Sequence, residues 1–157
     1  ENLLLNENIT KKELADKIIK KLRMHYFAIL ALVLVLILFL ELCFKEKVDV
    51  VLPEAMYIIQ VFVVLFTLIF ISVAIKGFTW NLERAKGLAE ERFVVKFVRS
   101  SMYRTNFLFC VLAVNAIAYC MIGYEGALYC GLLGLGAMIY SFPTKRVLEL
   151  YLNDREK

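Results

Sequence analysis

Long runs of apolar residues alternate with shorter charged segments along the chain. Four of these runs, at 24–44, 53–76, 106–123 and 126–142, reach the roughly 17 to 25 residues that a helix needs to cross a hydrocarbon core of about 30 Å. The pattern predicts four transmembrane helices arranged as two antiparallel hairpins. The first run is long and lacks a small-residue cleavage pattern, so we expect it to remain as an anchor rather than be removed as a signal peptide.

The segment before the first run, residues 1–23, has the pattern of an amphipathic helix. Thr10 begins a capping-box pattern, in which a hydroxyl and a glutamate three residues later satisfy free backbone N–H groups at a helix start. Leu14, Ile18 and Leu22 then lie on one stripe among lysines. We expect this helix to run close to the first span.

Two further charged segments also predict amphipathic helices. In the central segment, 77–105, Gly77 is expected to end the second span and Thr79 to begin a separate helix that is apolar on two sides. At the other end, Pro143 interrupts the fourth run, and residues 143–157 predict a short tail helix.

The composition requires an apolar solvent. Hydrophobic residues make up 61% of the chain and the mean hydropathy is +0.69, well above the roughly 45 to 50% that is usual in soluble domains. The predicted fold class is therefore an all-α integral membrane protein, with residues 1–157 forming one membrane domain.

The basic residues set the expected orientation. Of 19 lysines and arginines, six precede the first run, seven lie within residues 76–105 and four follow Pro143, whereas two lie between the first and second runs and none between the third and fourth. Because basic loops are retained in the cytoplasm, both termini and the central segment are predicted to be cytoplasmic, in the cell (inner or plasma) membrane. The net charge of +4 then reflects this bias and possible anionic-lipid contacts, and we expect no nucleic-acid partner.

The four cysteines do not form a recognisable redox or metal motif. Cys43, Cys110, Cys120 and Cys130 include no CxxC pair and no Cys/His ligand spacing, and all lie within or beside apolar runs. They are expected to act as small apolar residues, with a Cys120 to Cys130 disulfide as a minor alternative. We expect no metal and no cofactor.

The fourth run carries a ridge of small residues. Ala127 and Gly131 are four residues apart, and Gly126, Cys130 and Gly134 repeat the same spacing. Small residues at this spacing let a second helix backbone approach closely in a membrane. The order of glycines and the absence of a preceding strand exclude a dinucleotide fingerprint, so the ridge is interpreted as a helix-packing surface.

A polar residue at mid-membrane depth is the leading candidate for a functional site. Asn115 lies in the middle of the third run, and a turn centred near residue 124 or 125 would place it level with Gly134. Tyr119 and Gln60 fall at a similar depth in the outer half of the bundle. We interpret Asn115, Tyr119 and Gln60 as an interhelical clamp, with a substrate or ion site, or unrelated lipid-facing positions, as alternatives.

Glu41 is the only acidic residue within an apolar run apart from Glu54, which is the second residue of the second run. An acid inside a membrane is a functional candidate by default. However, Glu41 lies within a turn of the outer end and Lys45 follows four residues later, so an interfacial Glu–Lys pair is favoured over ion coupling.

These features favour a non-enzymatic membrane protein that assembles with itself or with another membrane protein through the small-residue ridge and the cytoplasmic helices. The first alternative is a small transporter or channel subunit that uses Gln60, Asn115, Tyr119 and Glu41. The second is an enzyme acting on lipid at the cytoplasmic face, which would have to use His25, Glu83, Glu90 and Glu91. No nucleophile and base are recognisable as a pair, so the sequence favours a protein without catalytic activity.

Overall fold

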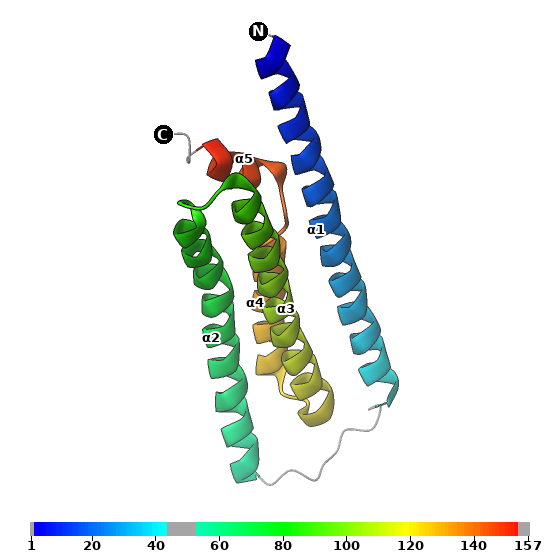
Figure 1. The fold of residues 1–157 in the computed structure, drawn as a ribbon. Coiled ribbons are helices and arrows are strands. Elements are labelled where there is room, and N and C mark those ends of the chain that lie inside the picture. Colours follow the sequence, from blue (N-terminus) through cyan, green and yellow to red (C-terminus); the bar gives the residue numbers. More distant parts are fainter. Residues whose placement is uncertain (1, 44–52, 154–157) are drawn as a thin grey trace.

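The computed structural model describes residues 2–43 and 53–153, with the side chains of 13–43 and 55–150. The described residues form five helices and no strand (Figure 1). The helices are α1 (Asn2–Cys43), α2 (Pro53–Ala85), α3 (Glu90–Ile122), α4 (Glu125–Tyr140) and α5 (Lys145–Asn153).

Three helices are long and apolar enough to cross a membrane, over Glu13–Cys43, Ala55–Ala85 and Glu90–Ile122. The fourth apolar helix, α4, has 16 residues. The fold is thus all-helical, and the three long apolar helices indicate a membrane protein. Because α2 and α3 each contain 33 residues, or about 50 Å at 1.5 Å per residue, they extend well beyond a hydrocarbon core of about 30 Å.

The expected break between the second span and a separate central helix is wrong. Gly77 lies inside α2, and the hydroxyl of Thr79 donates to the carbonyl of Ile75 one turn earlier, at 3.3 Å, rather than capping a new helix. A glycine inside a helix costs about 1 kcal/mol relative to alanine, and burial of the neighbouring Phe78 and Leu82 offsets this cost. The chain therefore turns only between Ala85 and Glu90.

The start of α1 also differs from the prediction. Thr10 lies inside the helix, which begins at Asn2 and continues without a break to Cys43. The capping-box pattern at Thr10 is therefore not used as a helix start. The amphipathic segment and the first apolar run form a single helix of 42 residues.

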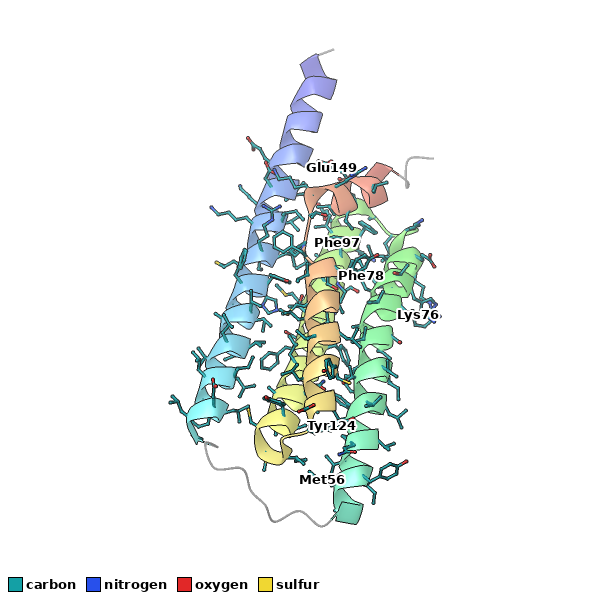
Figure 2. The ribbon with its side chains drawn as sticks, turned by 180° about the vertical axis from the view of Figure 1, so that it is seen from behind. Met56, Lys76, Phe78, Phe97, Tyr124 and Glu149 are labelled. Atoms are coloured by element: carbon teal, nitrogen blue, oxygen red, sulfur yellow. The ribbon has the colours of Figure 1, made fainter. Side chains whose placement is uncertain are left out.

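Helix α3 lies at the centre of the bundle. It packs against α1, α2 and α4, whereas no Cα atoms of α1 and α2 lie within 8 Å of each other in the part of the chain that the structure describes. Figure 1 shows α1 and α2 on opposite sides of α3, with α4 behind it, and Figure 2 shows α4 from the other side. The predicted first hairpin is therefore not a packed pair, because α3 and α4 separate its two helices.

The ends of α1, α2 and α3 that carry the N-terminus and the α2–α3 turn pack together with α5. We call this part of the molecule the platform. Phe78 of α2 faces Phe97 of α3 there, with ring centroids 5.9 Å apart (Figure 2). The platform core consists of nine buried residues: Ala15, Ile19, Leu22, Phe78, Leu82, Ala85, Phe93, Phe97 and Leu148. Burial of this kind, in a segment rich in charges, gives the bundle a second core beside the one within the apolar runs.

Two smaller clusters join the helices within the apolar runs. One contains Tyr26 and Val33 of α1, Ala74 of α2, Leu108 and Leu112 of α3 and Met138 of α4. The other lies nearer the α3–α4 turn and contains Val63, Ala118 and Ala127. Outward-facing leucines and phenylalanines such as Leu38, Phe62 and Leu133 remain 59% exposed, as expected of helices surrounded by lipid.

Candidate functional site

Asn115 is buried at the junction of three helices. Its side chain is 1% exposed, and Nδ2 donates to Thr67 Oγ1 of α2 at 2.8 Å and to the carbonyl of Val111, one turn earlier in α3, at 2.8 Å. Thr67 is fully buried. The amide is thus an interhelical contact between α2 and α3, close to α4.

The other polar atom of this amide has no hydrogen-bond partner among the described residues. Oδ1 of Asn115 is buried and unpaired. Leaving a buried acceptor unpaired costs roughly 1 to 3 kcal/mol, which cancels much of what the bond to Thr67 contributes. The contact therefore acts more to fix which faces of α2 and α3 meet than to stabilise the bundle.

The predicted register between the third and fourth runs is wrong by one helical turn. The position level with Asn115 is Gly131, where an added Cβ would lie 3.7 Å from Asn115 Cβ, whereas Gly134 faces Val111 and Leu112. The cause is an early turn: α3 ends at Ile122 and Gly123 adopts a left-handed conformation (φ 67°), with its N–H bonded to the Tyr119 carbonyl at 2.9 Å. The centre of the turn is thus near residue 123.

The structure does not bring the predicted polar cluster together. Tyr119 is 42% exposed on the outer surface of α3, and Gln60 is half-buried. Neither forms a hydrogen bond with Asn115 among the described side chains. The side chain that forms a hydrogen bond with Asn115 is Thr67. It lies seven residues after Gln60 on the same face of α2, and this spacing was the sequence signal that could have identified it.

Neither Glu41 nor a cysteine is a hydrogen-bond partner of Asn115 among the described residues. Glu41 is exposed near the end of α1, and its expected partner Lys45 lies outside the described residues. All four cysteines are free thiols, with Cys130 buried and Cys120 partly buried, so the minor disulfide alternative is wrong.

We expect Thr67→Val to destabilise the bundle by about 1 kcal/mol, because the Asn115 amide loses one of its two acceptors while interhelical hydrogen bonds in membranes average about 0.6 and reach about 1.7 kcal/mol. In an Asn115→Leu background the same change should cost little. A double-mutant cycle, measured as unfolding in mixed detergent micelles, isolates this coupling. Ser72→Ala, at an exposed position of α2, is the control, and an equal cost of Thr67→Val in both backgrounds would contradict the contact.

A second polar arrangement holds the end of α4. The last turn of α4 contains no basic residue, and carbonyls in this turn and just after it accept hydrogen bonds from side chains of other helices. The guanidinium of Arg104 donates to the Ser141 carbonyl at 2.8 Å, the hydroxyl of Tyr26 to the Met138 carbonyl at 3.1 Å, and Nε of Arg23 to the Pro143 carbonyl at 3.3 Å. We call these three side chains the α4 anchor.

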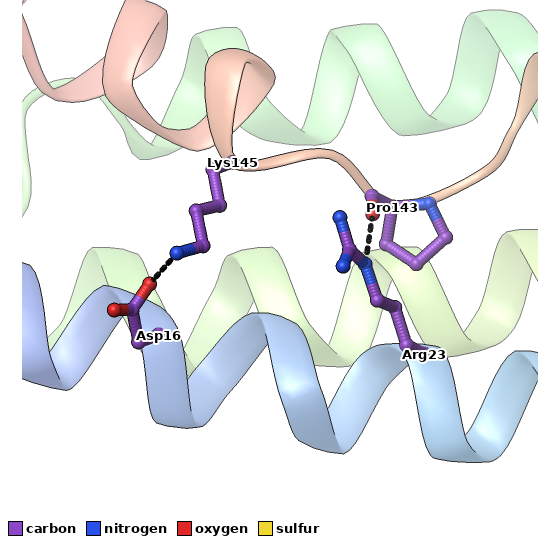
Figure 3. A network of polar contacts seen from close by, with 4 residues as sticks. All are labelled: Asp16, Arg23, Pro143 and Lys145. Carbon is purple, nitrogen blue, oxygen red and sulfur yellow. Dashed lines mark hydrogen bonds and ion pairs between the residues drawn. The ribbon is translucent and has the colours of Figure 1, made fainter.

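The two positive charges of the α4 anchor, on Arg23 and Arg104, lie at the carbonyl end of α4. The carbonyl end of a helix carries a partial negative charge, which nearby cations stabilise. Arg104 also lies over the Phe78 ring at 3.9 Å, and Arg23 lies 5.4 Å from the centroid of Phe142. At the start of α5, just after this connection, Lys145 forms an ion pair with Asp16 of α1 (Figure 3). The anchor thus joins α1, α3 and the connection from α4 to α5.

Sequence reasoning missed the α4 anchor. Arg104 and Arg23 were counted only as part of the charge bias, although Arg23 lies directly before the first apolar run and Arg104 two residues before the third. The absence of a cation in the last turn of the fourth run was the available signal, because such a helix end needs donors from elsewhere.

The residues that a lipid enzyme would require do not lie in one cleft. His25 precedes Tyr26, which packs in the same cluster as Leu108 of α3. Glu90 and Glu91 lie in the first turn of α3, about 25 Å away along the helix at 1.5 Å per residue. The geometry therefore gives no support to this alternative.

Comparison with known proteins adds no relative: no family model, no curated protein and no solved structure matches the chain.

Proposed function

We propose that the chain is a non-enzymatic membrane protein that assembles with a second copy of itself through its platform. In this proposal α4 is a fourth crossing, and the termini, the α2–α3 turn and α5 lie in the cytoplasm. The distribution of lysine and arginine supports this orientation, since all but two of the 19 belong to the segments at the platform end or to the chain termini.

The observation that carries the proposal is the separate core of the platform. Ile19, Leu82 and Phe93 are each no more than 1% exposed there, although the surrounding segments are highly charged. Helices that only cross a bilayer do not need to extend several turns past the hydrocarbon core and pack against one another there. A fixed arrangement of helices outside the apolar runs is suited to presenting one surface to another protein.

The platform carries a recess that suits an apolar side chain from a partner. It has a volume of about 330 Å³ and lies between α2, α3 and the α4–α5 connection. Phe97, Val147 and Leu150 contribute apolar walls, and Ser101 and Arg104 contribute polar atoms. Leu150 of α5 is 61% exposed at this recess, which makes it accessible to a second copy.

The small-residue ridge has a different role from the one that the sequence suggested. Ala127, Cys130 and Gly134 are buried inside the chain, and Gly134 faces α3. Since these positions are already occupied by α3, the proposal assigns contact between copies to the platform rather than to the ridge.

The transporter alternative has less support. It needs an open interior at Asn115, whereas Asn115 and Thr67 are buried against each other, and Tyr119 and Glu41 face outward. The buried contact between Asn115 and Thr67 and the outward-facing positions of Tyr119 and Glu41 therefore give no support to a shared pathway.

Light scattering of the purified protein in detergent tests the proposal. We expect a particle that contains at least two 18.1 kDa chains. Leu150→Glu should shift it to a single chain, because a carboxylate at the contact would have to be desolvated. Leu14→Glu, which adds the same charge at an exposed position of α1, should leave the mass unchanged. A strict monomer at high protein concentration contradicts the proposal.

A further inference from the structure

A groove runs along the seam between α1 and α3, where the platform meets the apolar runs. It has a volume of about 560 Å³. Its lining comprises Ile18, Lys21, Val94, Val95, Val98, Arg99, Met102, Tyr103 and Asn106. None of these is acidic, and both of the charged residues are basic.

The two charges of this groove are available to a ligand. Among the described residues, neither Lys21 nor Arg99 forms an ion pair or a hydrogen bond, unlike Arg23 and Arg104 in the α4 anchor. Both side chains are exposed. Arg99 lies on the ridge between this groove and a second one, toward α2, which contains Arg92 and Lys96 along with Glu91. The surface around Arg99 therefore carries a net positive charge.

The position of the groove matches the surface of a bilayer. It extends from Lys21, just before the first apolar run, to Asn106, the first residue of the third. Tyr103, which is 57% exposed, and Asn106 lie at the end nearer the apolar runs. Tyrosine is typical of membrane interfaces, and Val98 and Met102 provide apolar walls between the charges and the membrane.

We propose that the α1–α3 groove binds the head group of an anionic glycerophospholipid. Lys21 and Arg99 contact the phosphate, the amide of Asn106 contacts the glycerol and ester region, and the acyl chains pass along Met102 into the bilayer. Basic pockets between helices on the cytoplasmic side are suited to such head groups. A second copy of the chain is a less suitable occupant, because two copies would bring Lys21 and Arg99 toward one another. The proposal rests on the membrane placement given above and not on assembly.

Quenching of a fluorophore in the groove by brominated lipid tests this proposal. The protein carries Tyr103→Trp in a Trp80→Phe background, which removes its single natural tryptophan, and is reconstituted in mixtures of phosphatidylcholine and phosphatidylglycerol, one of which has dibrominated chains. We expect phosphatidylglycerol to bind at least fivefold more tightly than phosphatidylcholine, since each basic residue near a membrane surface contributes about fivefold, or about 1 kcal/mol.

The control variants have equal changes in charge. Lys21→Gln with Arg99→Gln should abolish the preference for phosphatidylglycerol, whereas Lys20→Gln with Arg146→Gln, at exposed positions outside the groove, should retain it. Inorganic phosphate at 10 mM should not displace the lipid, which separates a membrane lipid from free phosphate.

The possible failures are distinguishable. Equal quenching by both lipids overturns the lipid proposal, and so does an equal loss of the preference for phosphatidylglycerol in both double variants. Neither result contradicts the membrane placement. If neither lipid quenches the fluorescence, the groove does not face the bilayer, either because the membrane placement is wrong or because a second copy of the chain covers the groove. This result also overturns the lipid proposal. The lipids are present in both leaflets, so the result does not depend on the orientation of the protein.

Discussion

Replacing Phe93 by alanine is expected to lower the free energy of unfolding of the platform by about 3 to 5 kcal/mol, the range for aromatic side chains removed from a packed core. Phe93 is 0% exposed, and its ring lies 6.5 Å from that of Phe97 between α2 and α3. Because it lies in the first turn of α3, its loss would weaken the contact that holds the α2–α3 turn against the rest of the platform.

Urea denaturation in detergent micelles, followed by the fluorescence of Trp80, measures this effect. Trp80 is the single tryptophan of the chain and stacks on Arg84 at 3.9 Å within the platform. Tyr103→Ala removes an aromatic ring of similar size from the same helix at a position that is 57% exposed, and its cost should be within about 0.5 kcal/mol. Equal costs for the two variants would show that the platform has no core of its own.

Gly134→Leu is expected to separate α4 from α3 and to destabilise the bundle by about 1 to 3 kcal/mol, or more if the helices cannot move apart. A Cβ added at Gly134 would lie 3.0 Å from Val111 Cγ1 and 3.4 Å from Leu112 Cδ2, which already requires these side chains to shift. The rest of a leucine side chain has no space at this contact. The gain in helix propensity on replacing glycine is too small to compensate.

Gly136→Leu provides a matched control, because an added Cβ there meets nothing within 4 Å. Both variants change the same residue type in the same helix by the same side chain. Thermal unfolding followed by circular dichroism, together with the particle mass, compares them. If Gly134→Leu leaves the unfolding temperature unchanged but dissociates an oligomer, the ridge joins copies of the chain rather than helices within one chain.

The apolar pattern was sufficient to predict the helical class, because about twenty consecutive apolar residues have few alternatives to a membrane helix. It was less informative about where helices end. Gly77 resembles a stop and Thr10 a start, but α1 and α2 continue through them, and beyond Gly77 the residues Phe78 and Leu82 are buried by neighbouring helices. Burial of Phe78 and Leu82 depends on α1, α3 and α5, which no local pattern reveals.

The candidate site shows the same limit. The sequence identified Asn115 because an amide is conspicuous among apolar residues, and the structure places it in the interior. The α4 residue that lies level with it depended on the register of α3 and α4, which is set by the position of a single turn at Gly123. An error of one or two residues in the centre of a turn moves the opposite residue by about one helical turn, which was enough to pair Asn115 with Gly134 instead of Gly131.

The length of α4 has a consequence for the surrounding lipid. As the proposed fourth crossing, its 16 residues span about 24 Å, several ångströms less than the hydrocarbon thickness of a typical bilayer. Proline at position 143 prevents the helix from simply extending, and Arg23 and Arg104 hold its end in place. With α4 as a crossing, we expect lipids beside it to shorten or tilt their chains, so that the membrane is thinner on this side of the protein than beside α1 and α2. We then expect the protein to favour thin regions of a membrane and to orient its α4 face toward them.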